Sequence, residues 1–407
     1  MKIIDRYALL RLFGVVSKFI SILCIPVIFE VSEIALFSIV LAAERFVSFV
    51  CSMEAHSYFN RRLIHRNYSI EYVNNQHIPI FIIGVFLSLF VGLFYVWKMD
   101  INNLYVYIMI LAILGSVQNE MIRRAQAISR INVFSILNAL KSSSLALAIA
   151  TIVIMDVNDF IIFLKIFSLL SLVICLLGVI SYRELCAFSV GAVSKRLKSI
   201  QYLTAGVSVL SKFFIQGSSI FGLAILERSL ILNTYKDSDL AAHYSIQSIA
   251  LAALVLMDIF YWGPNYRKFI SAFRMPELTV LKVVASYKKQ IIFFQIFIVF
   301  SFLSAAFGLA VISNNWDMII SNNLLWVVIN VLLIIIIPID TILTYFVHAR
   351  QRDIVNANAG IMGLLAMTAF FLVEFDSLYI PFGIVIFYVV SLVIKLFSDT
   401  RLSTVYS

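Results

Sequence analysis

Charged residues are scarce in this sequence. Asp, Glu, Lys and Arg together make up 13% of its 407 residues, and 62% of the residues are hydrophobic. Ordinary soluble proteins carry about 25% charged residues, and the mean hydropathy here is +1.00. This composition excludes a soluble globular protein and predicts a chain that crosses a membrane many times.

Cysteine is also rare. The chain has four cysteines, Cys24, Cys51, Cys175 and Cys186. They form no CxxC pair and lie within or beside different apolar segments. We therefore expect them to pack as small apolar side chains, and we predict neither a metal site nor a disulfide.

Long polar segments are missing as well. The longest stretches between apolar runs are 54–77, 181–204 and 263–289, each of about 25 residues. A membrane polymerase or acyltransferase usually needs a larger extramembrane segment to hold its catalytic groups and its acceptor. The sequence also has no His/Asp or paired-carboxylate constellation of the kind used for acid–base catalysis. We therefore expect a protein that is not an enzyme and that works within the membrane.

Apolar runs of membrane-spanning length make up most of the chain. A helix needs about 20 apolar residues to cross the bilayer core, and twelve runs have about this length. They cover residues 8–28, 34–53, 78–96, 104–122, 133–154, 160–180, 205–226, 241–262, 290–312, 323–346, 357–373 and 378–397. The sequence thus predicts an all-α integral membrane protein with about twelve transmembrane helices.

Lys and Arg are distributed unevenly between the two sides of these spans. The terminal segments and the even-numbered connections hold 21 of the 31 Lys and Arg residues. The opposite side holds three, Lys98, Arg228 and Lys236, together with eleven acidic residues. Because Lys and Arg accumulate on the cytoplasmic side, both termini are predicted in the cytoplasm. The net charge of +9 then belongs to the inner rim, and we expect no nucleic-acid partner.

Two short repeats indicate an internal duplication. ALFSI at 35–39 matches AHYSI at 242–246, and SKF at 17–19 recurs at 211–213. Many transporters are built from two related halves, each contributing helices to a central site. We therefore expect two six-helix lobes around a central cavity. The predicted lobes are residues 1–200 and residues 201–407.

The same segments resemble a known transporter family. Gly14, Pro26 and the stretch SEIALFSIVLAAERF at 32–46 are similar to the start of bacterial polysaccharide flippases of the multidrug/oligosaccharidyl-lipid/polysaccharide exporter superfamily. LERSLILNTYKDSDLAAHYSIQSIAL at 226–251 resembles that family's connection between helices 7 and 8. The chain departs from the family's glycine before the aromatic, since it has Ala-Leu-Phe and Ala-His-Tyr there.

The resemblance implies a flippase that moves undecaprenyl-pyrophosphate-linked oligosaccharide from the inner to the outer leaflet of the bacterial cytoplasmic membrane. Its substrates would be O-antigen or capsule repeat units, and its partners a polysaccharide polymerase and a chain-length regulator. No cofactor is implied, although a proton or sodium gradient would supply the energy. Two alternatives stay open: a membrane enzyme of polysaccharide assembly, such as a polymerase or acyltransferase, and a cation-coupled drug exporter.

Eleven charged residues fall within the predicted spans. Arg11 and Lys395 lie near span ends and are interpreted as snorkelling, while Glu120 is expected to pair with Arg123 or Arg124 one turn later. Six others lie deep: Lys18, Glu44, Arg45, Lys141, Lys165 and Lys212. A charge at the bilayer centre costs roughly 3 kcal/mol, so these six must face water or one another.

The deep set contains five bases and one acid, which favours anion binding. Lys18, Arg45, Lys141 and Lys212 are the predicted contacts to a lipid pyrophosphate. Ser38, Ser48 and Ser52 share a helical face with Arg45, which favours a hydrated cavity wall over helix-to-helix contact. Glu44 is expected to turn toward Lys18 or Lys141.

Two acids, Asp258 and Asp340, are the predicted sites of ion coupling. Pro338 lies two residues before Asp340 and loosens the helical hydrogen bonding there. The alternative is that both acids face basic loop residues at helix ends.

Overall fold

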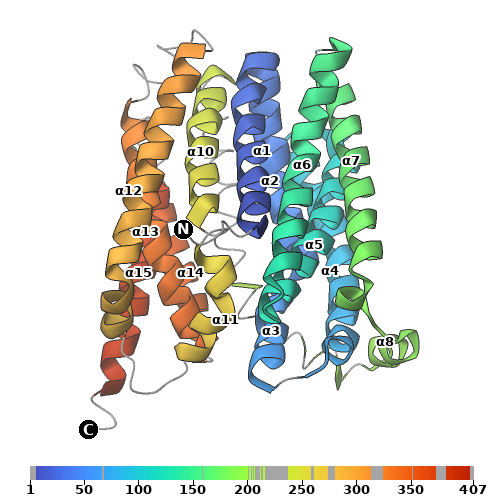
Figure 1. The fold of residues 1–407 in the computed structure, drawn as a ribbon, viewed down its shortest axis with the longest axis vertical. Coiled ribbons are helices and arrows are strands. Elements are labelled where there is room, and N and C mark those ends of the chain that lie inside the picture. Colours follow the sequence, from blue (N-terminus) through green and yellow to red (C-terminus); the bar gives the residue numbers. More distant parts are fainter. Residues whose placement is uncertain are drawn as a thin grey trace. The chain divides into compact units, whose positions relative to one another are not determined.

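The structure is a computed structural model, and every regular element among its described residues is a helix. It describes residues 6–66, 68–157, 159–199, 201–202, 204, 206, 211, 214–215, 237–257, 261–273, 280–312, 324–350, 352–372 and 382–403. Within these ranges the ordered elements are α-helices joined by short 3-10 segments and turns (Figure 1).

The chain divides into two compact units, unit 1 (Met1–Phe214) and unit 2 (Ile215–Ser407). Unit 1 contains α1 (Arg6–Ile28), α2 (Val31–Ser52), α3 (Ala55–Arg66), α4 (Ile70–Lys98), η1 (Asn102–Leu104), α5 (Tyr105–Ala127), α6 (Ile131–Met155), α7 (Phe160–Ser181), η2 (Arg183–Cys186) and α8 (Val190–Leu197). Unit 2 contains α10 (Asp237–Met257), α11 (Gly263–Ala272), α12 (Val280–Ile312), α13 (Leu324–Ala349), α14 (Asp353–Leu372) and α15 (Phe382–Ser403).

Eight described helices are long and apolar enough to cross a membrane. They are α1, α2, α4, α5, α6 and α7 of unit 1 and α13 and α14 of unit 2, and α10, α12 and α15 each contain a shorter apolar helix. An all-α, multi-pass membrane protein is therefore confirmed for the described residues. The total of twelve spans and the two six-helix lobes stay predictions, since most of the predicted span 205–226 lies outside the described residues.

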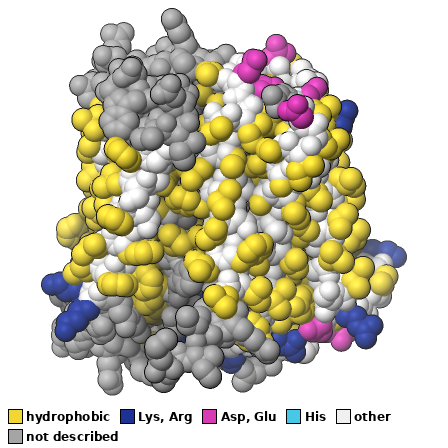
Figure 2. All heavy atoms as spheres, turned by 45° about the horizontal axis from the view of Figure 1, so that its top comes forward, with side chains coloured by type: hydrophobic (Ala, Val, Ile, Leu, Met, Phe, Trp, Pro, Cys, Tyr) yellow, Lys and Arg dark blue, Asp and Glu magenta, His cyan; other side chains and the backbone are white. Residues whose placement is uncertain are grey.

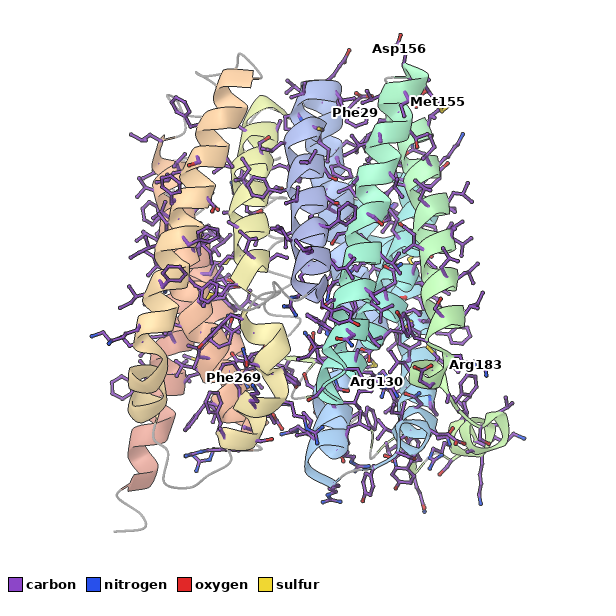
Figure 3. All side chains as sticks on the ribbon, in the orientation of Figure 1. Phe29, Arg130, Met155, Asp156, Arg183 and Phe269 are labelled. Atoms are coloured by element: carbon purple, nitrogen blue, oxygen red, sulfur yellow. The ribbon has the colours of Figure 1, made fainter. Side chains whose placement is uncertain are left out.

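The two ends of unit 1 carry opposite charge. Asp156 and Asp159 are exposed at one end, and Figure 3 shows Asp156 at the tip of α6 with Arg130 and Arg183 toward the other end. We call these the acidic end and the basic end. Between them, the space-filling view shows hydrophobic side chains over the surface (Figure 2). Phe90, at 72% exposed on α4, belongs to this apolar surface, as expected for a helix that faces lipid.

The connection 54–77, expected as a polar loop, is largely helical. It holds α3 and the first two turns of α4, which begins where the Ser69 hydroxyl accepts a hydrogen bond from the Tyr72 amide at 3.2 Å. The reason is tertiary packing: the polar residues 74–77 are buried against neighbouring segments instead of facing water.

Small residues let the helices of unit 1 approach closely. A Cβ added to Gly14 of α1 would lie 3.0 Å from the Cα of Ala139 in α6, and one added to Gly84 of α4 would lie 2.2 Å from the Cys51 carbonyl oxygen in α2. At the acidic end, the Phe29 ring packs 5.1 Å from that of Phe163. Helices in lipid associate through such close packing, because burial from water provides little drive there.

Candidate functional site

Three of the deep charges of unit 1 lie around Glu44. Its carboxylate lies within electrostatic reach of Lys141 on α6, its neighbour Arg45 and Lys18 on α1. A Cβ on Gly115 of α5 would lie 2.9 Å from Glu44 Oε1, so the carboxylate rests against the bare backbone of that glycine. This placement agrees with the expectation that Glu44 turns toward Lys18 or Lys141. We call Lys18, Glu44, Arg45, Asn119 and Lys141 the deep cluster.

Asn119 joins this cluster although the sequence did not single it out. The Lys141 ammonium donates a hydrogen bond to Asn119 Oδ1 at 2.6 Å. Asn119 lies four residues after Gly115, and therefore on the same face of α5. Its role was missed because an uncharged amide in an apolar run carries no strong signal by itself. The i, i+4 spacing from Gly115 was the available clue.

The members of the deep cluster lie at similar depth. From the helix bounds, Glu44 and Asn119 lie eight residues from the basic ends of α2 and α5, and Lys18 and Lys141 lie twelve and ten residues from the basic ends of α1 and α6. At 1.5 Å per residue these distances are about 12 to 18 Å. The cluster is therefore one layer of charge inside the membrane-spanning part of unit 1.

Two predicted members are not among the residues that form this layer in the described part of the chain, for different reasons. Lys165 of α7 is exposed on its helix and has no described contact with the cluster. Lys212 lies outside the described residues, as does Asp258. Lys18, Arg45 and Lys141 are half-buried, so each keeps part of its surface accessible while resting against neighbouring helices.

The serine stripe of α2 is buried and Ser48 makes a helix contact, which corrects the interpretation of the stripe as a cavity wall. The Ser48 and Ser116 hydroxyl oxygens lie 2.9 Å apart, and Ser116 also donates to the Ser48 carbonyl at 3.0 Å. Ser38, Ser48 and Ser52 are all buried. Ser48 thus joins α2 to α5, while the Ser52 hydroxyl donates to the Phe49 carbonyl of its own helix at 3.2 Å. A hydroxyl in an apolar bundle is satisfied by backbone and side-chain acceptors of this kind.

A second charged layer lies nearer the basic end. Glu120 contacts Arg123 and Arg124, each with a shortest N–O distance of 3.9 Å, which confirms the expected pairing one turn along α5. Arg124 NH2 also lies 2.6 Å from His77 Nδ1 on α4. Because a guanidinium only donates, His77 Nδ1 accepts here and the imidazole is neutral. Outside the spans, burial raises the pKa of the Glu54 carboxyl and the charge of Arg123, 4.0 Å away, partly opposes this.

Residues 74–77 hold the connecting segments of the basic end. The Asn74 amide donates to the carbonyls of Leu185 and Ala187, both at 2.9 Å, and Asn75 Oδ1 accepts from the Ser189 amide at 2.7 Å. The Tyr202 hydroxyl donates to the Gln76 carbonyl. Burial raises the pKa of Tyr202 to about 12, so this phenol stays protonated and remains a donor near neutral pH.

In unit 2, Asp340 forms a buried ion pair with Lys395 of α15. The Lys395 ammonium lies 2.7 Å from Oδ1 and 2.8 Å from Oδ2 of Asp340, and 2.8 Å from the Thr344 hydroxyl. The two side chains are 9% and 3% exposed. The interpretation of Lys395 as a snorkelling residue is therefore wrong, because its charge is neutralised inside the bundle.

The signal for this pair was present as helical spacing. Asp340, Thr344 and His348 recur every four residues on α13, and Ser391 and Lys395 do the same on α15. Ser391 donates to Asp340 Oδ1 at 3.0 Å. His348 is buried, and its Nδ1 lies 3.1 Å from Asp353 Oδ1 at the start of α14.

The four cysteines all lie in the described part of the chain. All four are free thiols; Cys51 and Cys175 are buried, and Cys51 donates to the Ser88 hydroxyl at 3.1 Å. The described residues contain no group of three or more His, Cys, Asp and Glu side chains that could hold a metal ion.

Comparison with known proteins shows the fold alone. No family model matches the chain, and neither does any curated protein sequence. A solved structure described as "protein A" superposes with a TM-score of 0.67, covering 98% of this chain and 96% of its own, at 13% sequence identity. At this identity the match indicates a shared fold and carries no argument about substrate.

Proposed function

We propose that the protein is a flippase for lipid-linked oligosaccharide, moving undecaprenyl-pyrophosphate-linked repeat units across the bacterial cytoplasmic membrane. The observation that carries the proposal is the deep cluster, in which Lys18, Arg45 and Lys141 surround the single acid Glu44. Three bases against one acid leave a surplus of positive charge well inside the bundle. In a medium of low dielectric constant such a surplus attracts anions strongly.

The residues of the deep cluster would interact with a bound anion in different ways. Arg45 offers a planar fork that fits a phosphate oxygen pair, and the lysines act as point charges. Asn119 fixes the Lys141 ammonium through the 2.6 Å hydrogen bond, and Glu44 offsets part of the charge when the site is empty. A lipid pyrophosphate fits this arrangement better than a cationic drug, which would need a surplus of acids.

Loss of a cluster base is expected to reduce glycan export per molecule. Arg45→Ala and Lys141→Ala each remove a charge-assisted contact, so export should fall about tenfold or more. Arg45→Lys should recover part of it, because the charge remains while the fork is lost. Surface polysaccharide and the amount of protein in the membrane are measured together in a strain that lacks the native gene. Lys18→Ala and Lys212→Ala belong to the same series, because both lysines are predicted to contact the pyrophosphate.

Lys165→Ala is the matched control for this series. It removes a lysine from a membrane helix of the same unit, but one that is exposed outside the cluster. It should leave export unchanged. If Arg45→Ala and Lys141→Ala export as much glycan per molecule as Lys165→Ala, the cluster does not bind substrate. If they only lower protein abundance, its role is structural.

Both termini are expected in the cytoplasm, because the terminal segments and even-numbered connections carry 21 Lys and Arg residues and the opposite side carries three. Alkaline phosphatase fused after Ser407 should therefore be inactive, and the same enzyme inserted at Asp156 on the acidic end should be active. High activity of the terminal fusion would contradict an even number of spans with both ends inside.

Energy for transport is expected from an ion gradient, with Asp258 and Asp340 as the coupling candidates. Asp340 is engaged by Lys395, so any ion that reaches it must first replace that ammonium group.

A further inference from the structure

The Lys395 ammonium occupies a built oxygen site on α13. Three oxygen atoms lie within 2.8 Å of Nζ: both carboxylate oxygens of Asp340 and the Thr344 hydroxyl one turn later. The Ser391 hydroxyl holds the same carboxylate from α15, at 3.0 Å from Oδ1. These three acceptor oxygens belong to α13, while the Lys395 ammonium belongs to α15.

The charge of this site selects a monovalent cation. It contains one carboxylate, and the other oxygens belong to neutral hydroxyls, so one positive charge makes the buried group neutral. A divalent ion would leave an uncompensated charge inside the bundle, which is costly. Oxygen ligands of this type suit hard cations.

The site also lies next to a position where α13 lacks a backbone hydrogen bond. Pro338 has no amide hydrogen, so the helix lacks one hydrogen bond half a turn before Asp340. An apolar pair of similar size at Asp340 and Lys395 would be as stable or more stable than a buried ion pair. A buried pair beside a proline therefore suits an exchangeable contact better than a permanent one.

We propose that Asp340 and Thr344 form a monovalent-cation site that Lys395 fills as a tethered cation, and that sodium from solution takes its place when α15 moves the ammonium away. The existence of the site is independent of the transported substrate; its role in coupling rests on the proposed function. Removing the Lys395 ammonium should leave the site vacant and make the protein depend on sodium.

The test uses the purified full-length chain in lipid nanodiscs, with thermal unfolding followed in sodium chloride and in N-methylglucamine chloride at equal ionic strength. Without sodium, Lys395→Ala should lower the unfolding temperature by on the order of 10 °C, because Asp340 is left buried without a counter-charge. Sodium should restore about half of this loss or more. The wild-type protein and Lys288→Ala, which removes an exposed lysine of α12, should not respond to sodium.

Two further variants keep the proposal open to refutation. Lys395→Gln retains a donor near Asp340 and should show the same sodium response if Lys395→Ala does not fold. Asp340→Asn combined with Lys395→Met removes both charges and should be stable but unresponsive. The proposal is overturned if neither single variant responds to sodium, or if the double variant responds equally. Because no glycan is present, these results do not depend on whether the protein is a flippase.

Discussion

Replacing Arg124 with Ala is expected to lower the free energy of unfolding by about 3–5 kcal/mol, whereas replacing Arg130 with Ala should change it by less than about 1 kcal/mol. Both arginines belong to unit 1 and both contact a glutamate. The Arg130–Glu184 pair is the closer one, at 2.7 Å, but its side chains are 49% and 43% exposed. The Arg124–Glu120 contact is 3.9 Å, with side chains 3% and 10% exposed.

Burial decides between these two pairs, because water and salt screen the exposed charges far more strongly than the buried ones. Removing Arg124 also leaves His77 Nδ1, now 2.6 Å from the guanidinium, without that donor. Arg123 remains 3.9 Å from Glu120 and reduces the loss of stability. Denaturant-induced unfolding of the purified protein in mixed micelles measures both variants.

The comparison includes its own internal check. Arg124→Met combined with Glu120→Gln removes both charges and should recover much of the stability lost in Arg124→Ala. If Arg124→Ala costs no more than Arg130→Ala, the layer at the basic end does not contribute to stability as described.

Gly84→Ala is expected to disrupt the packing of α4 against α2 and to reduce strongly the yield of folded protein. The added Cβ would lie 2.2 Å from the Cys51 carbonyl oxygen and 2.9 Å from that of Val50. Both are backbone atoms, so no side-chain rotation relieves the clash and the helices must separate. Overpacking of this kind costs about 1–3 kcal/mol and occasionally more. Separation would also stretch the 3.1 Å hydrogen bond between Cys51 and Ser88, one turn along.

Gly308→Ala is the matched control, since it makes the same change at the end of the apolar stretch Ile292–Gly308 of α12. A Cβ there would meet no atom within 4 Å, and Ala favours a helix over Gly by about 1 kcal/mol. It should therefore be neutral or stabilising. Gly14→Ala, with its nearest backbone contact at 3.0 Å, should fall between the two. The monodisperse fraction after solubilisation and the unfolding midpoint provide the measurements. Equal stability of Gly84→Ala and Gly308→Ala would contradict the close approach of α2 and α4.

Several features could be predicted because they depend on residues close together in the chain. The apolar runs predict the membrane helices directly, since the bilayer core requires about 20 apolar residues in succession. The contacts of Glu120 with Arg123 and Arg124 follow from helical spacing alone. Helix bounds were less accurate where polar residues were buried, as at the start of α4, because hydropathy alone treats such residues as a loop.

Contacts between distant helices needed the tertiary structure. Lys395 and Asp340 are 55 residues apart, and Ser48 and Ser116 are 68 residues apart. The sequence placed Lys395 near a span end and the serines on the face of Arg45, but which neighbour each face meets depends on how the helices rotate and pack. Asn74 illustrates the same limit, since its partners Leu185 and Ala187 lie more than 100 residues away.

The sequence by itself determined that this protein is an all-α membrane protein with charges buried in its spans, because hydropathy and charge are properties of single residues summed over short windows. Only the tertiary structure decided which charges neutralise one another. It brings Glu44 toward Lys141 and Lys18, joins Asp340 to Lys395, and places Ser48 of α2 against Ser116 of α5. The physical reason is that a buried polar group is stabilised by whatever partner the packing brings within hydrogen-bonding distance, and packing is set by close contacts between helices far apart in the chain.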